Sequence, residues 1–487
     1  MTLGVTPRAL SKLPDGLLVG GTWRPASSGR TFEVLDPASG EVLASVADAG
    51  PQDGAAALGA VAAAQSAWAA TPSRQRAELL RRAFERLTAD RETVAELISA
   101  EMGKPFAEAL AEVDYGAEFL RWYSEEAPRI TGDHRRSPDG GSRLLVHHRP
   151  VGPCLLITPW NFPLAMATRK VGAALAAGCT AILKPAAQTP LTSLLLARIL
   201  QECGLPDGVL AVLTTKSAGA VCGPLLADGR IRKLSFTGST EVGRRLLEQC
   251  GPQIVRPSME LGGNAPFIVL ADADLDRAVE GAMVAKMRNM GEACTAANRF
   301  LVHQDVADEF SEKLAARIAD LRMGHGLDTA TQVGPVIDED AQVRLGGLVA
   351  DAVGRGARLA EPGGVVDGPG TFFKPTVVVD VPTEARLFTE EIFGPVVAIT
   401  AVADTDEAVE LANRTEYGLV AYLYTRDVEK ALNTVDRLEV GMVALNRGIV
   451  SNAAAPFGGV KQSGLGREGG REGIHDYLDI QYVALDA

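Results

Sequence analysis

The sequence has 487 residues, of which 46% are hydrophobic and 22% are charged, and this composition excludes a disordered or low-complexity chain. The length exceeds the roughly 250–300 residues at which a single hydrophobic core stops growing, so we expect two or three domains. Lys and Arg number 48 and Asp and Glu number 61, which gives a net charge of −13 at pH 7. This balance argues against a protein that tracks nucleic-acid phosphates, and an anionic small substrate would need local arginines.

Targeting and metal-binding signals are not found in the sequence. Residues 171–183 form the longest near-apolar stretch, which is shorter than the roughly 20 residues of a membrane span. Residues 1–20 have no continuous apolar segment of a signal peptide. The six cysteines contain no C-x-x-C pair and the six histidines are scattered, so we predict reduced thiols, a cytoplasmic location and no metal.

Helical periodicity dominates the first part of the chain, between residues 55 and 125. Residues 77–87 and 94–102 are the clearest cases and predict solvated helices that cover another layer. From Leu144 onward, short β-rich runs alternate with helical runs. Strands are predicted over 153–157, 180–183, 209–213 and 233–236, and helices over 167–177, 191–203, 218–226 and 240–250. This alternation predicts a parallel sheet with helices on both faces.

A second alternating series begins near Pro266 and runs to about Leu445. It starts with strand 267–270, helix 275–290, strand 300–302 and helix 306–321, and it predicts a second α/β unit. The strand predicted over Leu478 to Ala484 has no helix after it, and we expect it to pair with another chain or with a distant sheet edge.

Two glycine motifs compete as the phosphate-binding turn of a nucleotide cofactor. Residues 464–469, G-L-G-R-E-G, match G-x-G-x-x-G, but no strand precedes them and no amphipathic helix follows, so we reject a Rossmann fingerprint. In residues 234–243, a strand runs directly into a helix through Gly238 and Ser239, and the helix N-terminus suits a pyrophosphate. An ordinary helix capped by Ser239 or Thr240 fits this stretch equally well.

Three polar residues are the best candidates for chemistry. Cys294 follows a helix in polar, glycine-broken sequence, whereas the other cysteines lie in apolar or glycine-rich segments, so Cys294 is the candidate nucleophile. Glu260 ends a short strand before two glycines, and a solvated turn carboxylate is the alternative interpretation. Asn161 lies between prolines in a rigid loop, where a side-chain amide can stabilise an oxyanion or serve as a turn residue.

Several motifs in order along the chain resemble the aldehyde dehydrogenase superfamily. They are T-P-W-N-F-P at 158–163, L-K-P at 183–185, F-T-G-S-T-E-V-G at 236–243, M-E-L-G-G-N at 259–264, G-E-A-C at 291–294, E-E-I-F-G-P at 390–395 and P-F-G-G-V-K-Q-S-G at 456–464. The resemblance implies that Cys294 attacks an aldehyde, that Asn161 and the Cys294 N–H hold the oxyanion, and that Glu260 activates water to hydrolyse a thioester. It also implies a cofactor site for NADP or NAD formed by Trp160, Lys184, Ala187, Gly238, Ser239, Gly243, Leu261, Glu391 and Phe393.

The resemblance further implies an architecture. We expect a Rossmann-like cofactor domain over residues 1–128 and 149–259 and an α/β catalytic domain over 260–446. A small β oligomerisation element would combine residues 129–148 and 465–487. Relatives of this kind form dimers or tetramers, so a homodimer or homotetramer is expected.

Within the family, the chain resembles members that oxidise succinate semialdehyde. The resemblance rests on Arg169, Arg288 and Ser451 with their flanking residues, which would grip the far carboxylate of the substrate, and a guanidinium has the right shape for this. Glutarate semialdehyde is the alternative substrate. An enzyme for uncharged aldehydes, or a catalytically silent binding protein, would not need this set of residues.

Three positions depart from the family pattern. Ala296 replaces a second cysteine, so no disulfide can form two positions after Cys294. Arg447 stands where relatives have a small residue, and we expect it close to the mouth of the substrate pocket. Ala187 replaces a glutamate that repels a 2′-phosphate, and with Lys184 nearby we expect NADP to be accepted and preferred, with NAD also used.

Overall fold

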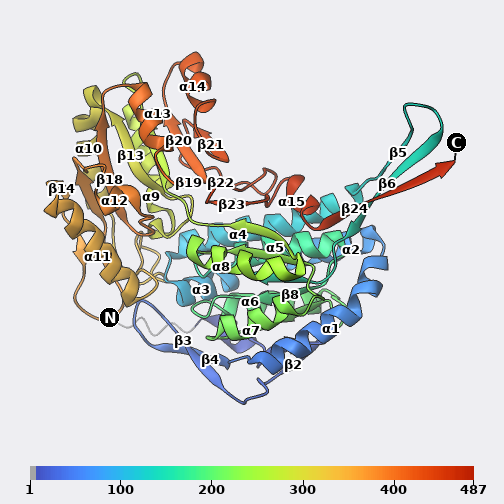
Figure 1. The fold of residues 1–487 in the computed structure, drawn as a ribbon. Coiled ribbons are helices and arrows are strands. Elements are labelled where there is room, and N and C mark those ends of the chain that lie inside the picture. The colour runs from blue at the N-terminus through green and yellow to red at the C-terminus, as the bar shows by residue number, and fades with distance from the viewer. Residues whose placement is uncertain (1–6, 487) are drawn as a thin grey trace.

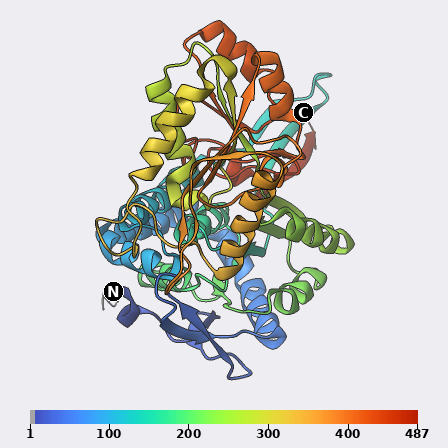
Figure 2. The same cartoon turned by 90° about the vertical axis from the view of Figure 1, so that its left-hand side faces the viewer.

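The computed structural model describes residues 7–486. The fold consists of two α/β units, each built on a mostly parallel sheet, and of a narrow three-stranded sheet that projects from them (Figures 1 and 2). Residues 1–6, part of the segment where we expect no signal peptide, and residue 487 lie outside the described residues. None of the described helices is long and apolar enough to cross a membrane.

The larger sheet has eight strands in the order β2-β1-β9-β8-β7-β10-β11-β23. Its five central strands are parallel, and β1, β2 and β23 are added antiparallel at the two edges. The strands are β1 (Leu17–Val19), β2 (Thr22–Arg24), β7 (Cys154–Ile157), β8 (Ala181–Lys184), β9 (Leu210–Val212), β10 (Lys233–Thr237), β11 (Arg256–Glu260) and β23 (Gly464–Leu465).

Helices cover both faces of this sheet because its central strands are apolar on both sides. In β7, Leu156 packs with the helices of one face and Leu155 with those of the other, as the alternation of side chains along a strand requires. One face carries α2 (Ser73–Ala89), α3 (Arg91–Met102), α4 (Phe106–Glu126), α5 (Pro163–Ala177) and α6 (Leu191–Glu202), and the other carries α1 (Pro51–Ala70), α7 (Ala218–Ala227) and α8 (Thr240–Cys250).

The second sheet has seven strands in the order β14-β17-β18-β13-β12-β20-β21. All neighbours are parallel except β14 and β17. The strands are β12 (Ala265–Val269), β13 (Ala297–His303), β14 (Arg358–Glu361), β17 (Thr376–Val379), β18 (Val396–Val402), β20 (Val420–Tyr424) and β21 (Met442–Leu445). The helices of this unit are α9 (Leu275–Met287), α10 (Gln304–Ala319), α11 (Glu339–Gly354), α12 (Arg386–Thr389), α13 (Thr405–Asn413) and α14 (Val428–Val435).

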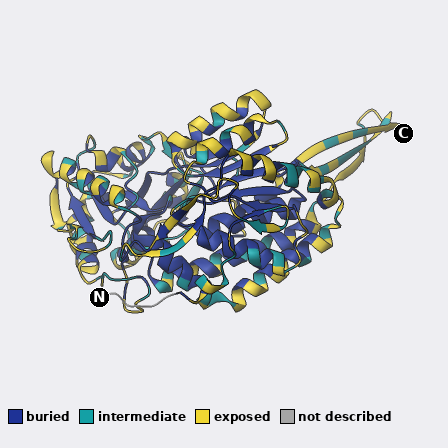
Figure 3. Cartoon of the chain, turned by 90° about the horizontal axis from the view of Figure 1, so that it is seen from below, coloured by how far each residue is buried: buried dark blue, intermediate teal, exposed yellow. Residues whose placement is uncertain are grey.

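The projecting sheet joins two distant parts of the chain. Strand β24 (Leu478–Asp486) pairs antiparallel with β6 (Ser142–Pro150), which pairs with β5 (Asp133–Arg136). The terminal strand therefore pairs with a distant strand of its own chain, as one of the two sequence alternatives predicted. The projecting sheet is exposed to solvent along most of its length (Figure 3).

Short elements complete the fold. They are β3 (Thr31–Leu35) paired with β4 (Val42–Ala47), β15 (Gly364–Val365) with β16 (Phe373–Lys374), β19 (Tyr417–Gly418) with β22 (Val460–Lys461), α15 (Glu472–His475) and the 3₁₀ turns Arg8–Lys12, Ala127–Arg129, Gly251–Gln253 and Arg288–Gly291. Strands β1 to β4 were not predicted from the sequence, because they are short and lack a strong alternating pattern.

The predicted solvated helix over residues 94–102 was partly wrong. The helix is present as α3, but Val94, Ala95 and every residue from Leu97 to Met102 are buried. It lies against α4, α6 and the N-terminal 3₁₀ turn. Burial by neighbours on several sides cannot be seen in the periodicity of one segment.

Candidate active site

A cavity of about 480 Å³ lies where the carboxyl ends of the first sheet face the second unit. This is where ligands bind in open parallel sheets. It brings together eleven of the fifteen residues that the sequence singled out, namely Trp160, Asn161, Arg169, Gly238, Ser239, Leu261, Arg288, Cys294, Glu391, Phe393 and Ser451. Glu260, Lys184, Ala187 and Gly243 are not part of its lining.

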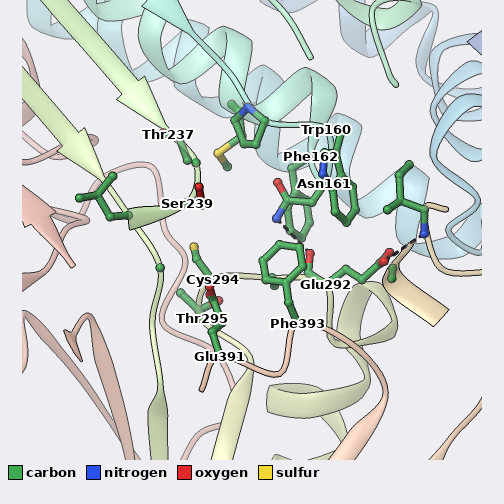
Figure 4. Close-up of a pocket in the computed structure, with 18 of the residues that line it drawn as sticks. Trp160, Asn161, Phe162, Thr237, Ser239, Glu292, Cys294, Thr295, Glu391 and Phe393 are labelled. Carbon is green, nitrogen blue, oxygen red and sulfur yellow. Dashed lines mark hydrogen bonds between the residues drawn. The ribbon is translucent and has the colours of Figure 1, made fainter. Parts of the chain in front are cut away.

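Cys294 lies on an irregular segment between α9 and β13. Asn289 and Met290 have positive φ angles of 57° and 52°, so the chain turns sharply after α9. The Asn289 side chain donates to the carbonyl oxygens of Glu292 at 2.9 Å and Asn161 at 3.1 Å, which holds this turn against the Asn161 loop. The Cys294 sulfur points toward the space between Ser239 and Asn161 (Figure 4). Burial raises the pKa of the thiol to about 12, partly offset by Arg169.

Asn161 is held at both its backbone and its side chain. It follows β7 and precedes Pro163, the first residue of α5. Its Nδ2 donates to the Glu292 carbonyl at 2.9 Å, and its own carbonyl accepts from Lys104 Nζ at 2.8 Å. Asn161 therefore has a fixed side-chain amide beside Cys294. The second N–H of its Nδ2 remains free to donate to an oxyanion.

The Lys104 ammonium forms a buried ion pair with Glu112, with Nζ 2.5 Å from Oε2, and neither side chain is exposed. Glu112 Oε1 also accepts from the first backbone N–H groups of α5, from Leu164 at 2.9 Å and Ala165 at 3.2 Å. The Glu112 carboxylate thus pairs with the Lys104 ammonium and also accepts from the free N–H groups at the start of α5, directly after the Asn161 loop.

Glu260 is buried, so it is not the solvated turn carboxylate of the alternative interpretation. It ends β11, and within the described part of the chain its Oε2 has no hydrogen-bond partner. Burial and the neighbouring Glu468 carboxylate raise the pKa of Glu260 well above its usual range, while Arg169 and Lys170 act in the opposite direction. A carboxyl group with a raised pKa is suited to taking a proton near neutral pH.

The two arginines line the same cavity as Cys294. Arg169 on α5 is 1% exposed, and Arg288 follows α9 with its Nη1 3.4 Å from Ser451 Oγ. The Arg288 guanidinium lies 4.9 Å from the centre of the Phe162 ring and 5.9 Å from that of Tyr115. Two cations and a hydroxyl therefore line a cavity with aromatic walls, which suits a small aldehyde that also carries a carboxylate.

The strand-to-helix turn at Gly238 and Ser239 has the form predicted from the sequence. Strand β10 ends at Thr237, and Ser239 caps α8 by accepting from the Val242 N–H at 3.4 Å. A Cβ at Gly238 would lie 2.4 Å from the Phe236 ring, and one at Gly243 would lie 2.5 Å from Leu261. Gly243 thus serves close packing of α8 rather than the lining of the cavity.

Glu391 and Phe393 enter the cavity from the second unit. Glu391 Oε1 accepts from the Gly263 N–H at 3.1 Å, and burial raises the pKa of this carboxyl to about 7. Phe393 packs edge-on against Trp160 with ring centres 5.4 Å apart. Arg344 donates to the backbone carbonyls of Glu391 and Phe393, each at 3.2 Å, which orients the segment.

Lys184 and Ala187 lie at the carboxyl end of β8, outside the cavity. Lys184 is 8% exposed, and burial lowers the pKa of its ammonium. Ala187 is half-buried and packs on the core of the first unit, and the next residue, Gln188, is exposed.

The expected place of Arg447 at the mouth of the substrate pocket was wrong. Arg447 lines a separate hollow with Gly281, Val284 and Tyr424. Strand β21 ends at Leu445 and Asn446 has a positive φ of 51°, so the chain turns before Arg447. Ser451, four residues later, is the first of this loop to line the cavity.

Other cavity residues were missed by sequence reasoning. They are Tyr115, Phe162, Met166, Glu292, Thr295, Phe457 and several neighbours. Tyr115 lies on α4, far from any motif, and its helical pattern gave no sign of a site. Glu292 lies in the G-E-A-C motif, and its buried Oε1 accepts from the Ile337 N–H at 3.0 Å (Figure 4). Among residues 7–486, no group of three or more His, Cys, Asp and Glu side chains is arranged to hold a metal ion.

This arrangement is that of a two-sheet α/β enzyme with a thiol in the crevice between its sheets. The sequence pattern of the aldehyde dehydrogenase family matches residues 23–483, and the chain belongs to this family. It is 58% identical over 444 residues to a succinate-semialdehyde dehydrogenase of Paenarthrobacter nicotinovorans, covering 91% of this chain and 99% of the relative.

Two further comparisons give the range of relatives. A glutarate-semialdehyde dehydrogenase of Pseudomonas putida is 47% identical over 467 residues, covering 96% of this chain and 97% of the relative. The crystal structure of an NADP-dependent enzyme of E. coli superposes with a TM-score of 0.96 at 46% identity, covering 98% of this chain and 99% of the other.

Proposed function

We propose that this enzyme oxidises succinate semialdehyde to succinate, with NADP preferred and NAD also accepted. The observation that carries the proposal is that Arg169, Arg288 and Ser451 line the same cavity as Cys294. A substrate held by its carboxylate at the arginines presents its aldehyde end to the thiol. The names of the semialdehyde dehydrogenases to which the chain is similar support the same substrate class.

Cys294 is the proposed nucleophile. Because the pKa of its thiol is raised to about 12, the proton must leave as the sulfur attacks the carbonyl carbon. Glu260 is the nearby carboxylate whose raised pKa suits it to take that proton. The Asn161 amide and the Cys294 backbone N–H stabilise the oxyanion of the thiohemiacetal.

The second half of the reaction releases the acid. A bound nicotinamide would supply the hydride acceptor that the oxidation of the thiohemiacetal on Cys294 to a thioester requires. Glu260 first gives up the thiol proton to solvent and then takes a proton from water, whose hydroxyl adds to the thioester carbon. The tetrahedral intermediate expels the Cys294 thiolate, which regains a proton from Glu260, and the acid leaves as succinate after losing its own proton to solvent. The presence of this base favours hydrolysis over transfer of the acyl group to another thiol.

The residues present fit a nicotinamide dinucleotide. Gly238 keeps the turn free of a side chain, since a Cβ there would collide with the Phe236 ring, and Ser239 caps α8, whose first amides suit a pyrophosphate. Within the described residues, the buried hydroxyl of Thr237, which lines the cavity, has no partner and is a polar group for a ligand at this end. Glu391 is the proposed contact to the nicotinamide ribose, with Trp160, Leu261 and Phe393 as walls.

The preference for NADP rests on Lys184 and Ala187. Lys184 supplies a cation at the end of β8, and Ala187 introduces no carboxylate that would repel a 2′-phosphate. The E. coli structure described as NADP dependent is consistent with this choice.

Initial rates of reduced-cofactor formation test the proposal. Succinate semialdehyde, glutarate semialdehyde, butanal and benzaldehyde would each be assayed with NADP and NAD. We expect kcat/KM for succinate semialdehyde to exceed that for butanal by about tenfold or more, which corresponds to about 1.4 kcal/mol of transition-state binding. Equal values for butanal would refute the substrate assignment, and a higher value for glutarate semialdehyde would favour the five-carbon substrate.

We also propose a cytoplasmic homodimer or homotetramer. The projecting sheet exposes Ile480, Tyr482 and Leu485, with exposed fractions of 72%, 58% and 47%. Strand β21 leaves one edge of the seven-stranded sheet unpaired within the described residues, and such edges pair readily. Light scattering of the wild type and of Ile480→Lys measures the assembly, and a monomeric wild type would contradict it. The six free cysteines fit a reducing compartment.

A further inference from the structure

Glu468 lies in the glycine motif that we rejected as a cofactor fingerprint, and it contacts two cations of α5. Its Oε2 is 2.7 Å from Arg169 Nε, and its Oε1 is 2.5 Å from Lys170 Nζ and 3.2 Å from Ser235 Oγ. Arg169, Lys170 and Glu468 are all buried, with at most 4% of each exposed. This is a buried charge cluster, in which each charge depends on its partners.

The backbone of Glu468 is fixed against the cavity wall. Its N–H and carbonyl exchange hydrogen bonds of 2.8 and 2.7 Å with Phe457, which lines the cavity. The Phe457 ring centre lies 4.4 Å from the Arg169 guanidinium carbon, and the Phe119 ring lies at 5.6 Å from it. The Tyr123 hydroxyl accepts from the next residue, Gly469, at 2.9 Å. The position of Glu468 is therefore fixed, and its carboxylate can hold the Arg169 guanidinium in one orientation.

Arg169 retains hydrogen-bonding capacity on its other side. Within the described part of the chain, its Nη2 contacts only a weak acceptor, the Met166 sulfur at 2.9 Å. Its buried Nη1 has no partner among residues 7–486, and its Nε meets Glu468 Oε2 at 2.7 Å as an ion pair without hydrogen-bond geometry. With Nε against Glu468, the Nη1 and Nη2 pair remains for a second carboxylate, and a guanidinium can serve two carboxylates on different edges.

We propose that Glu468 is a positioning residue that holds Arg169 for the carboxylate of the substrate, and that it thereby sets the preference for a semialdehyde over an uncharged aldehyde. This inference rests on the proposed function. It concerns the orientation of Arg169 rather than the net charge of the site. In the wild type, Arg169, Lys170 and Glu468 together carry one positive charge. In a variant without the Glu468 carboxylate, the buried Lys170 tends to lose its proton. Arg169 then carries the one positive charge, so the net charge of the cluster is the same.

A general loss of activity would not test this, because Lys170 and Glu468 also lie near Glu260. The informative quantity is the ratio of kcat/KM for succinate semialdehyde to that for butanal. Effects on the thiol, on Glu260 or on the cofactor act on both substrates and cancel in this ratio. Effects through Arg169 act only on the substrate that has a carboxylate.

The experiment is a double-mutant cycle of Glu468→Gln and Arg169→Met in the full-length enzyme. We expect E468Q to lower the ratio by about tenfold in the wild-type background and by less than about twofold in the R169M background. The inhibition constant of succinate, measured against that of butyrate, should rise by a similar factor in E468Q without any turnover. Glu472→Gln, an exposed glutamate nearby, is the matched control and should leave the ratio unchanged.

Each outcome decides the inference. An unchanged ratio in E468Q, or an equal change in both backgrounds, would overturn it while the proposed function stands. A wild-type enzyme without preference for succinate semialdehyde would overturn the proposed function and this inference with it. If E468Q does not fold, Glu468→Asp is the second variant. It keeps the carboxylate charge, but the side chain is one methylene shorter, so the carboxylate lies farther from Arg169. It should lower the ratio by about threefold, and an unchanged ratio in E468D would also refute the inference.

Discussion

Replacing Lys104 by methionine tests whether a buried ion pair supports the Asn161 amide, the proposed oxyanion donor. Methionine keeps the length of the side chain but removes the ammonium, which contacts Glu112 Oε2 at 2.5 Å and the Asn161 carbonyl at 2.8 Å. Glu112 is then left buried without its cation. Removal of one partner of such a pair costs roughly 3–5 kcal/mol.

The expected shift in melting temperature follows from the size of the chain. An unfolding entropy of about 2.1 cal/mol/K per residue gives roughly 1.0 kcal/mol/K for 487 residues that unfold together. A loss of about 4 kcal/mol therefore lowers Tm by about 4 °C. The Asn161 carbonyl keeps its hydrogen bond from Asn289 at 3.1 Å. The Asn161 loop therefore stays in place, but with one hydrogen bond fewer to fix it. We expect kcat to fall by about tenfold, with KM changed by less than about twofold.

Calorimetry and initial rates measure these two effects. Arg91→Met is the matched control, because Arg91 and Asp114 form an ion pair between α3 and α4 that is exposed to solvent. Such pairs contribute about 1 kcal/mol or less, so the control should lose no more than about 1 °C. Lys104→Arg should recover part of the lost kcat. A Tm for Lys104→Met within 1 °C of that of Arg91→Met would refute the reasoning.

Four further predictions concern the reaction itself. Asn161→Ala should lower kcat by about 10² to 10³ with little change in KM, because an oxyanion donor is lost, and a loss below about tenfold would contradict this role. Glu260→Gln should slow both the burst of reduced cofactor and the steady-state rate, because Glu260 takes a proton in both halves of the reaction; stopped-flow absorbance measures the burst, and a burst rate equal to that of the wild type would count against its role toward the thiol. Ala187→Glu should lower kcat/KM for NADP by about tenfold and leave that for NAD within about threefold, because a carboxylate repels the 2′-phosphate, and equal losses for both cofactors would contradict this. Alkylation of Cys294 in the enzyme without cofactor should become about tenfold faster per pH unit from pH 7 to 9, because the thiolate reacts and the pKa of the thiol is raised to about 12; a plateau in this range, followed by mass spectrometry of the peptide, would show a lower pKa.

The sequence by itself determined many of the local elements and indicated the candidate residues of the reacting centre. Strand β10 and helix α8, joined by Gly238 and capped by Ser239, followed from a buried apolar run, a glycine and a hydroxyl. These features depend on neighbours within a few residues, so a linear pattern contains them. The resemblance of the motifs to one family further identified Cys294, Glu260 and Asn161, whose roles stay predictions.

Only the tertiary structure decided which distant side chains meet. Lys170 and Glu468 are 298 positions apart and share a buried contact, and Tyr115 reaches the cavity from a helix without any motif. The expected position of Arg447 was wrong because the loop after β21 places this residue in a hollow separate from the cavity. Burial of charge and the direction of a loop depend on packing between segments that are remote in sequence, and no local pattern records that packing.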